Sequence, residues 1–462
     1  MATRPDTSTA AQSQDGAITS ELLKKYQGDF NATATNRLAQ NAVTQTSVTD
    51  VALNRNVVTA IDHTFSIKLD DWSVTNQKKS GRCWMFAGLN LLRVGAMKKM
   101  NLTDFEFSQN YTLFWDKFER ANYFLEQIID TADRDTDNRT VAFLLQRPLD
   151  DGGQWNMFIN IVNRHGLVPK SAMPETESSS ATMRMNQLII HKLRENACTL
   201  RAEAKNGAEL ASLRQTKDEM LSVIYRMLAI HLGTPPQSFD WQWHDKDKNF
   251  HRDGEMTPKE FAEKYVTIPV NDYVCLVNDP RETSPIGRTF TVDRLGNVVG
   301  GNIVKYLNVE TDLMKEIAVK TLQDGEPVWF GCDVGKMMQR DLGLWDANLY
   351  DFETLYGTSF GLNKAERLLH QQTQMTHAML FTGADIADDD RNKNRPRRWR
   401  VENSWGDENG KKGFYTMNDS WFDEYMFEIG ADKKYLPEEL QKALDTEPIV
   451  LAPWDPMGSL AR

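Results

Sequence analysis

Cys83 is the residue of this sequence best suited to nucleophilic chemistry. It follows Gly81-Arg82 and precedes an apolar stretch, so it stands at the N-terminus of a helix expected at about 83–100. The free N–H groups and the dipole at a helix N-terminus favour a thiolate over a thiol. A single cysteine of this kind is weak evidence, since most unpaired cysteines are small buried hydrophobic residues.

His377 and Asn403 have the residue types that such a nucleophile needs as partners. A nucleophilic thiol requires an imidazole to take and return its proton, and the imidazole requires a group that orients it. His377 opens an apolar strand in THAMLFTGA, and Asn403 stands between a strand and a turn in RVENSWG. Taken singly, each is better explained as an ordinary core or turn residue. Trp405, two residues after Asn403, could shield a histidine–asparagine hydrogen bond from water, although a plain core tryptophan is commoner.

Gln77 precedes the cysteine by six residues (83 − 77 = 6) and lies in an expected loop. From there its amide can donate into an oxyanion hole beside the Cys83 backbone N–H. Gly152 and Gly153 stand before a helix expected at 154–165, where glycines would let a substrate backbone approach closely. By itself, a glycine pair is more often just a turn.

Five segments of different character follow one another along the chain. A tail and arm at 1–65 precede a mainly helical half at 66–175, which contains the candidate nucleophile. A helical and then hairpin-like insertion covers 176–268, short β-type runs dominate 269–448, and a Pro-bounded arm closes the chain at 449–462. Helices first and antiparallel strands later predict an α+β fold. Besides the two helices already named, apolar periodicity predicts helices at about 108–132, 182–231 and 310–323.

Composition excludes several classes of protein. The chain has 462 residues, a hydrophobic fraction of 40% and a charged fraction of 26%, as in a globular protein large enough to bury a substantial core. Its formal net charge of −11 disfavours a general polyanion binder. No apolar stretch approaches the roughly 20 residues of a membrane span, so no membrane association is expected.

Four sparse cysteines indicate a reducing, cytoplasmic environment. They form no C-x-x-C pair and show no zinc-finger spacing. The N-terminal residues lack the apolar run of a secretory signal and include acidic residues that a mitochondrial transit peptide avoids. The other three cysteines lie in apolar patterns and are expected in the core: Cys198, Cys275 and Cys332.

Two polar segments invite other kinds of site. The segment HDKDKNFHRDGE is rich in His and Asp, but Phe250 occupies the position where an EF-hand loop requires glycine. A solvated loop therefore explains it better, and no metal or other cofactor is expected. If oligomer geometry turned several copies inward, a basic run before the Asn403 strand could bind single-stranded nucleic acid weakly, although a solvated hairpin explains it better. This basic run comprises Arg391, Lys393, Arg395, Arg397, Arg398 and Arg400.

The candidate glutamine, cysteine, histidine and asparagine occur in the order and local contexts of papain-like cysteine peptidases, and the chain resembles that family. The histidine follows the cysteine by 294 residues (377 − 83 = 294), against about 130–150 in ordinary papains. A long helix near 110–148 and the block at 176–268 would account for the difference.

The motifs NQKKSGRCW, DDGGQW, THAML, VENSWG and PWDPMGSLA are similar to those of the bleomycin hydrolase and aminopeptidase C group within that family. The resemblance covers residues 45–462 and implies a papain-like core, with an insertion that makes oligomer contacts in a homohexamer. It also implies that the C-terminal arm lies in the cleft of its own subunit. Ala461 and Arg462 would then contact substrate, and Arg462 would be open to trimming by the enzyme itself.

The expected activity is that of a cysteine aminopeptidase acting on peptides with a free N-terminus. Cys83 would be the nucleophile, His377 its base, Asn403 the orienting group and Gln77 the oxyanion donor. The resemblance adds bleomycin and homocysteine thiolactone as further substrates. Two alternatives remain open: a single-stranded nucleic-acid-binding or regulatory hexamer with secondary peptidase activity, and a peptidase-fold protein without activity.

Overall fold

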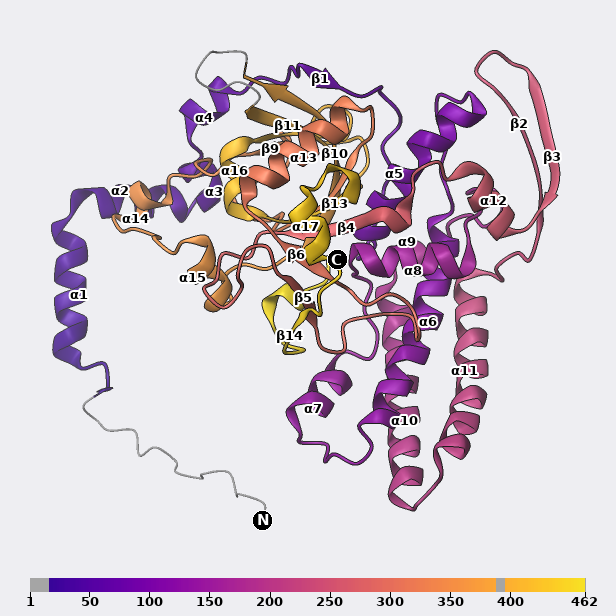
Figure 1. Cartoon of the computed structure of the whole chain (residues 1–462). Helices are drawn as coiled ribbons and strands as arrows, with labels where there is room; N and C mark the ends of the chain where they lie inside the picture. Colours follow the sequence, from indigo (N-terminus) through magenta and orange to yellow (C-terminus); the bar gives the residue numbers. More distant parts are fainter. Residues whose placement is uncertain (1–15, 388–394, 462) are drawn as a thin grey trace. The chain divides into compact units, whose positions relative to one another are not determined.

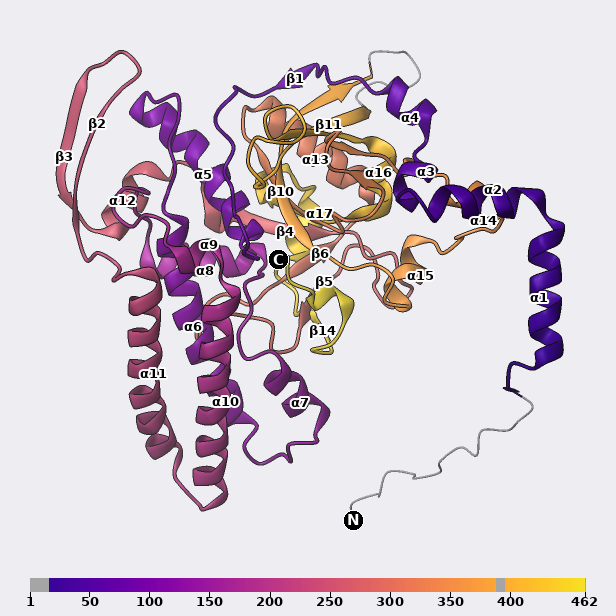
Figure 2. The same cartoon turned by 180° about the vertical axis from the view of Figure 1, so that it is seen from behind.

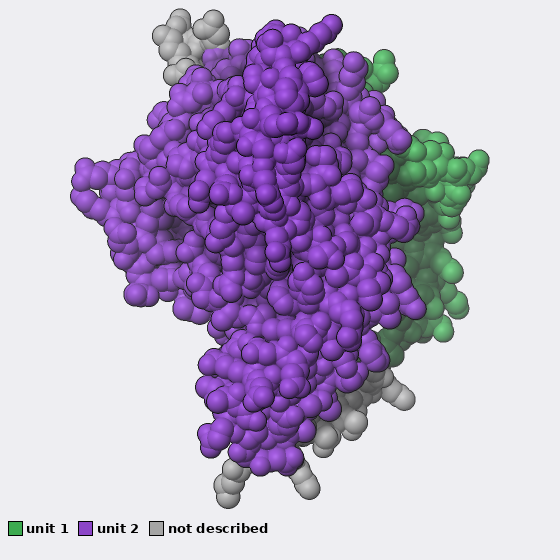
Figure 3. All heavy atoms as spheres, turned by 90° about the vertical axis from the view of Figure 1, so that its right-hand side faces the viewer, with its two compact units in different colours: residues 1–61, 348–361 green, residues 62–347, 362–462 purple. Residues whose placement is uncertain are grey.

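The computed structural model describes residues 16–387 and 395–461, which belong to two units. Figure 3 colours the two units separately. The smaller unit comprises residues 1–61 and 348–361, and the larger unit comprises residues 62–347 and 362–462. No sequence pattern indicated that the N-terminal helices associate with such a distant segment.

The smaller unit is built from short helices. Thr19 caps the first of them, since its hydroxyl accepts a hydrogen bond from the Leu22 N–H at 3.2 Å. Backbone pairing joins the two parts of the unit, because the Asn54 N–H donates to the Leu349 carbonyl at 2.8 Å. The helices are α1 (Ser20–Ala32), α2 (Ala34–Val43), α3 (Val48–Ala52), α4 (Arg55–Ala60) and α14 (Phe352–Tyr356).

The first part of the larger unit is helical, as expected. α5 (Cys83–Met100) is buried along almost its whole length. α6 (Gln109–Asp130) begins after Ser108, whose hydroxyl caps it by accepting from the Tyr111 N–H at 3.0 Å. The other helices of this part are α7 (Arg139–Gln146), α8 (Trp155–His165) and α9 (Glu177–Ser180).

Two long helices and a hairpin follow within the segment 176–268. α10 (Met183–Lys205) and α11 (Leu210–Leu232) run side by side with α6 in both views of the ribbon (Figures 1 and 2). β2 (Phe239–His244) pairs antiparallel with β3 (Phe250–Met256). α12 (Pro258–Tyr265) then returns the chain to the core.

Among the described residues, twelve strands form one mixed sheet in the order β14-β5-β6-β4-β13-β7-β10-β11-β12-β9-β8, with β1 paired on β10. Most neighbours are antiparallel, as expected, but β4 pairs with β6, β5 with β14 and β9 with β12 in parallel. The strands are β1 (Ile67–Lys68), β4 (Tyr273–Val277), β5 (Thr289–Val292), β6 (Tyr306–Asn308), β7 (Val328–Cys332), β8 (Met338–Gln339), β9 (Leu344–Trp345), β10 (His377–Ile386), β11 (Pro396–Glu402), β12 (Phe414–Asn418), β13 (Met426–Asp432) and β14 (Ile449–Leu451). The helices among them are α13 (Thr311–Gln323), α15 (Lys364–Leu369), α16 (Asp419–Tyr425) and α17 (Glu438–Ala443).

The central strands separate two hydrophobic cores. Successive side chains of a strand point to opposite faces of the sheet. Along β10, Ala378 and Leu380 therefore join the core that contains α5, whereas Met379 and Phe381 join the core that contains α13. This division packs the buried helix α5 directly against the strand that begins with His377.

The α+β class predicted from the sequence is confirmed. One expectation about the core is wrong, because Cys198 is exposed on α10 while Cys275 and Cys332 are buried. Ala197 and Leu200 of α10 are buried in the core, whereas Cys198 between them is not. The apolar pattern around Cys198 therefore does not include the cysteine itself. No helix in the described ranges is long and apolar enough to cross a bilayer.

Candidate active site

Cys83 is the first residue of α5, and its side chain is fully buried. The helix begins without a side-chain cap: the Met85 and Phe86 N–H groups bond the Arg82 carbonyl at 3.1 and 3.0 Å. The Arg82 guanidinium is in turn held by Glu175 at 2.7 Å. The first backbone N–H groups of α5 lie at the thiol, where they can stabilise negative charge.

His377 and Asn403 come together because β10 and β11 pair antiparallel. His377 Nε2 lies 2.9 Å from Asn403 Oδ1, and the Ser404 N–H donates to the same oxygen at 2.8 Å. The Trp405 ring lies 5.0 Å from the imidazole, between centroids, and covers it at an angle of 39°. The structure thus brings the expected imidazole, amide and indole into one cluster.

Burial favours the uncharged forms of both the thiol and the imidazole. It raises the pKa of Cys83 to about 12, although backbone N–H groups act in the opposite direction. It lowers the pKa of His377 to about 4, although the hydrogen bond with Asn403 opposes this. The sequence-based expectation of a low thiol pKa is therefore wrong for this state: desolvation outweighs the helix N-terminus.

Gln77 is held by its neighbours in an orientation that leaves one amide hydrogen uncommitted. Its backbone N–H donates to the Ser404 carbonyl at 2.8 Å, and its Oε1 accepts from the Ser404 hydroxyl at 2.6 Å. Its Nε2 donates one hydrogen to the Ser80 carbonyl at 2.6 Å. The remaining N–H can serve as an oxyanion donor, so Ser404 links the expected donor to the loop that carries Asn403.

Gly153 pairs with Ala461, the last described residue of the C-terminal arm. The Gly153 N–H donates to the Ala461 carbonyl at 3.1 Å in an antiparallel bridge, and Ala461 is fully buried. A Cβ at Gly153 would lie 2.5 Å from the ring of Trp84, the residue after Cys83, so only glycine fits there. The Gly152 carbonyl accepts from Arg120 instead. Arg462 lies outside the described residues.

The residues before Ala461 are anchored one by one. Asp455 forms an ion pair with Arg281 at 2.9 Å. Gln154 donates to the Ser459 carbonyl at 2.6 Å, and the Ser459 hydroxyl donates to the Met375 carbonyl at 2.7 Å. The C-terminal arm is therefore a fixed part of this site rather than a loose tail.

An open cleft of about 590 Å³ adjoins Gln77, His377 and Trp405. Its lining also includes Met183 and Ile190 of α10, which no sequence signal connected with the site. The apolar periodicity of this segment predicted only a helix that packs on the core. The tertiary fold is what brings the first turns of α10 to the cleft.

Asp151 is a second residue that the sequence did not single out. Its carboxylate accepts from the Gly81 N–H at 3.1 Å, from Asn186 at 2.7 Å and from Lys117 at 2.5 Å. The Thr182 hydroxyl donates to it as well. Burial alone would raise the pKa of Asp151, but the charge and hydrogen bond of Lys117 hold it below its usual range. Asp151 connects the loop before Cys83 to α10.

Neither polar segment noted in the sequence forms a further reactive centre. Asp245 accepts from the Asn249 N–H at 2.9 Å and from His251 at 3.0 Å, as a hairpin turn does. No group of three or more potential metal ligands occurs within residues 16–387 and 395–461.

Three arginines of the basic run are held in ion pairs, and the positions of Arg391 and Lys393 lie outside the described residues. The pairs measure 2.5–3.1 Å and join Arg397 and Arg398 to Asp385, Arg398 to Asp62, and Arg400 to Asp71.

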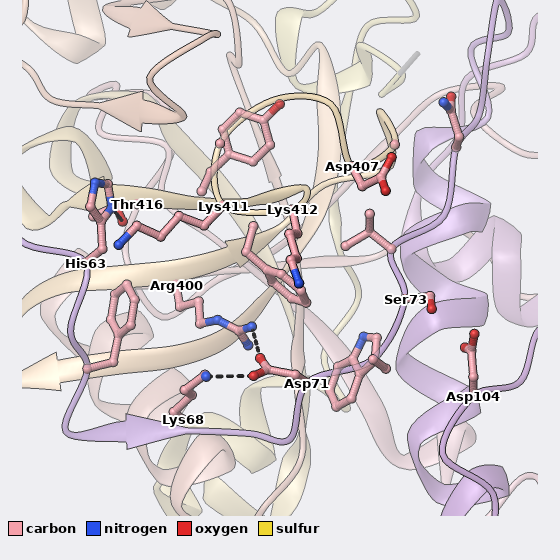
Figure 4. Close-up of a pocket in the computed structure, with 18 of the residues that line it drawn as sticks. His63, Lys68, Asp71, Ser73, Asp104, Arg400, Asp407, Lys411, Lys412 and Thr416 are labelled. Atoms are coloured by element: carbon pink, nitrogen blue, oxygen red, sulfur yellow. Dashed lines mark hydrogen bonds and ion pairs between the residues drawn. The ribbon is translucent and has the colours of Figure 1, made fainter.

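A larger cavity of about 1340 Å³ is lined in part by Asp407, Lys411 and Lys412, which follow Asn403 in the chain (Figure 4). Asp71 holds both Lys68, at 2.9 Å, and Arg400, at 2.5 Å, along one side of it. None of the four candidate catalytic residues lines this cavity. We therefore assign the chemistry to the side of the smaller cleft, which Gln77 and His377 line and which the loop before Cys83 borders through Ser80 and Gly81.

Comparisons with known proteins identify relatives of the whole chain. The sequence profile of the peptidase C1-like family matches residues 17–458. Bleomycin hydrolase of Mus musculus is 46% identical over 92% of this chain and 94% of its own length. Aminopeptidase C of Listeria innocua is 43% identical over 96% of this chain and 99% of its own length. The crystal structure of PepW from Lactobacillus rhamnosis, at 46% identity, superposes with a TM-score of 0.94 over 97% of this chain and 100% of that one.

Proposed function

The chain belongs to the peptidase C1-like family, and we propose that it is a cysteine aminopeptidase that removes residues from the free N-terminus of peptides. In this mechanism the Cys83 sulfur attacks the scissile carbonyl as its proton passes to His377. The Gln77 amide and the Cys83 backbone N–H stabilise the oxyanion. His377 then protonates the leaving amine, and water hydrolyses the thioester with His377 as base.

The pairing of Ala461 with Gly153 is the observation that carries the exopeptidase assignment. A papain-type cleft is open at both ends, so selection of free N-termini needs a block on one side of the nucleophile. The C-terminal arm supplies such a block beside Trp84. We propose that Arg462 is trimmed, so that the Ala461 carboxylate attracts the α-ammonium group of the substrate.

Removal of residues 456–462 tests this assignment, because Asp455 and its ion pair with Arg281 remain. We expect the full chain to cleave Ala-Leu-Ala and to leave N-acetyl-Ala-Leu-Ala intact. The truncated chain should cleave both peptides and also internal bonds of longer ones. A folded truncated enzyme that still rejects the acetylated peptide would show that the gate lies elsewhere.

We also propose a homohexameric, cytoplasmic enzyme that accepts bleomycin and homocysteine thiolactone. The substrate proposal rests on the relatives named bleomycin hydrolase. Four unpaired cysteines, all within the described residues, are consistent with a reducing compartment. Hydrolysis of each compound by the purified enzyme, and loss of that hydrolysis in Cys83→Ala, tests the substrates.

The nucleic-acid-binding alternative is not supported. The arginines at 397, 398 and 400 are already paired with carboxylates, which leaves them poorly placed to neutralise phosphates. The relatives carry the names of peptidases and hydrolases instead.

A further inference from the structure

The open cleft beside the catalytic cluster has one wall made by the insertion. Gln77, His377 and Trp405 form one side of this cleft of about 590 Å³, and α10 forms the other. Gly153 and Ala461 do not line it. The arm therefore does not occupy this cleft, which leaves the cleft free to receive the residues after the scissile bond.

The α10 wall is one face of a helix. Met183, Gln187 and Ile190 are spaced by four and three residues, which places them together on the cleft. Met185 and Ile189, on the other face, are buried in the core. The side chain of Met183 is an exception to the usual burial of large apolar residues, since Met183 is 70% exposed.

This helix face is held rigidly at the site. Asn186 and Thr182 both donate to Asp151, whose carboxylate also accepts from the Gly81 N–H before the nucleophile. In addition, the Lys79 N–H donates to the Ser180 carbonyl at 2.9 Å, just before α10. Two contacts of the loop before Cys83, at Lys79 and Gly81, thus hold the start of α10 beside Gln77 and Cys83.

We propose that Met183, Gln187 and Ile190 form the subsite for the second residue of the peptide substrate, the one that follows the scissile bond. The subsite selects large apolar side chains at this position of the substrate. When such a side chain binds, it covers apolar surface of Met183 and Ile190 that water would otherwise contact, and this burial is favourable. The flexible, polarisable methionine adapts to several shapes, so leucine, methionine and phenylalanine are all accepted. This inference rests on the proposed aminopeptidase function and adds its preferred substrate class.

The test compares the peptides Ala-X-Ala with alaninamide, which has no second residue. We expect wild-type kcat/KM to be about tenfold or more higher for X = Leu or Phe than for X = Glu or Lys. Met183→Lys should lower the Leu-to-Glu ratio and favour Glu over Lys, whereas Met183→Glu should favour Lys over Glu. Leu188→Lys is the matched control, because Leu188 is exposed on the same helix but does not line the cleft.

The outcomes separate the inference from the function on which it rests. If wild-type enzyme fails to hydrolyse both alaninamide and every tripeptide, the proposed function itself is wrong. If it hydrolyses them with equal efficiency for all X, or if both Met183 variants retain the wild-type order of X, the subsite proposal is overturned. A change of equal size in Leu188→Lys would also overturn it, because it would point to general charge rather than contact.

Discussion

The hydrogen bonds around Asn403 determine which nitrogen of His377 can act as the base. Because the Ser404 N–H donates to Asn403 Oδ1, that oxygen is an acceptor, and His377 Nε2 must carry the hydrogen directed at it. The lone pair of the neutral imidazole is then on Nδ1, the nitrogen left for the thiol. The amide thus selects the tautomer without taking part in proton transfer.

Substitution at the catalytic cluster should separate these roles. Cys83→Ala and His377→Ala should remove nearly all turnover, whereas Asn403→Ala should leave a measurable remainder, because orientation assists the chemistry without performing it. Gln77→Ala should cost about 10²–10³-fold in kcat, as the loss of one oxyanion donor does. Steady-state kinetics on an aminoacyl amide measure all four.

The pH profile supplies the check on Asn403. Burial lowers the pKa of His377 to about 4, and the hydrogen bond with Asn403 raises it against that effect. The acidic limb of the pH profile of kcat/KM should therefore have its midpoint near pH 4. In Asn403→Ala this midpoint should move to lower pH. A limb that moves to higher pH would contradict the assigned tautomer.

Alkylation should distinguish the exposed Cys198 from Cys83, the proposed nucleophile. Cys198 is exposed, and Cys83 is buried with its pKa raised to about 12, so iodoacetamide should modify Cys198 first and without loss of activity. Activity should fall only as Cys83 is modified, which mass spectrometry of the labelled peptides can follow. Cys198→Ser serves as the control. Loss of activity before any label reaches Cys83 would contradict the proposed nucleophile.

At the scale of elements, a buried ion pair holds the strand that precedes Asn403 against α5. Arg93 of α5 lies 2.7 Å from Glu402 of β11, and each side chain is 1% exposed. Trp72 and Asn90 also donate to the Glu402 carboxylate, at 2.6 and 2.9 Å. Burial raises the pKa of Glu402, although the charge of Arg93 opposes this. These contacts fix Asn403, the proposed orienting group, relative to the helix that begins with Cys83, the proposed nucleophile.

Breaking this pair should destabilise the larger unit. Arg93→Leu leaves the Glu402 charge buried without its cation, which costs about 3–5 kcal/mol. We expect a lower melting temperature by calorimetry, with partial recovery in the double variant Arg93→Leu/Glu402→Gln. Lys68→Leu is the matched control, because its ion pair with Asp71 is exposed and should contribute little. An Arg93 variant as stable as the control would show that the pair is not structural.

Local chemistry explains which elements the sequence could predict. α5 and α6 were predicted within about two residues, since apolar periodicity is a local signal. The exposure of Cys198, the position of Met183 on the cleft and the convergence of four donors on Asp151 depend on contacts between distant segments. The low pKa expected for Cys83 was wrong for the same reason: burial by other elements outweighed the local helix terminus.

At the scale of the whole molecule, α1 carries an apolar face whose side chains are exposed. Leu23, Tyr26 and Phe30 are spaced by three and four residues, so they share one side of the helix, and they are 50%, 54% and 38% exposed. No residue of α1 is buried. Continuous exposed apolar faces of this kind usually mark a surface that associates with another chain.

Charge on the α1 face should therefore weaken the proposed hexamer. Tyr26→Glu places a carboxylate in the middle of this face, and desolvating it without a partner would cost several kcal/mol at each copy of the interface. We expect light scattering after gel filtration to show a hexamer for the wild type and smaller species for Tyr26→Glu. Lys25→Glu is the control, because it changes charge beside the face without interrupting its apolar spacing. If Tyr26→Glu assembles as the wild type does, α1 does not form the contact, and if the wild type is a monomer the hexamer itself is excluded.

Retention of alaninamide hydrolysis in the dissociated variant would further show that each chain holds a complete active site, as the contacts from Gln77 to Ala461 within one chain require.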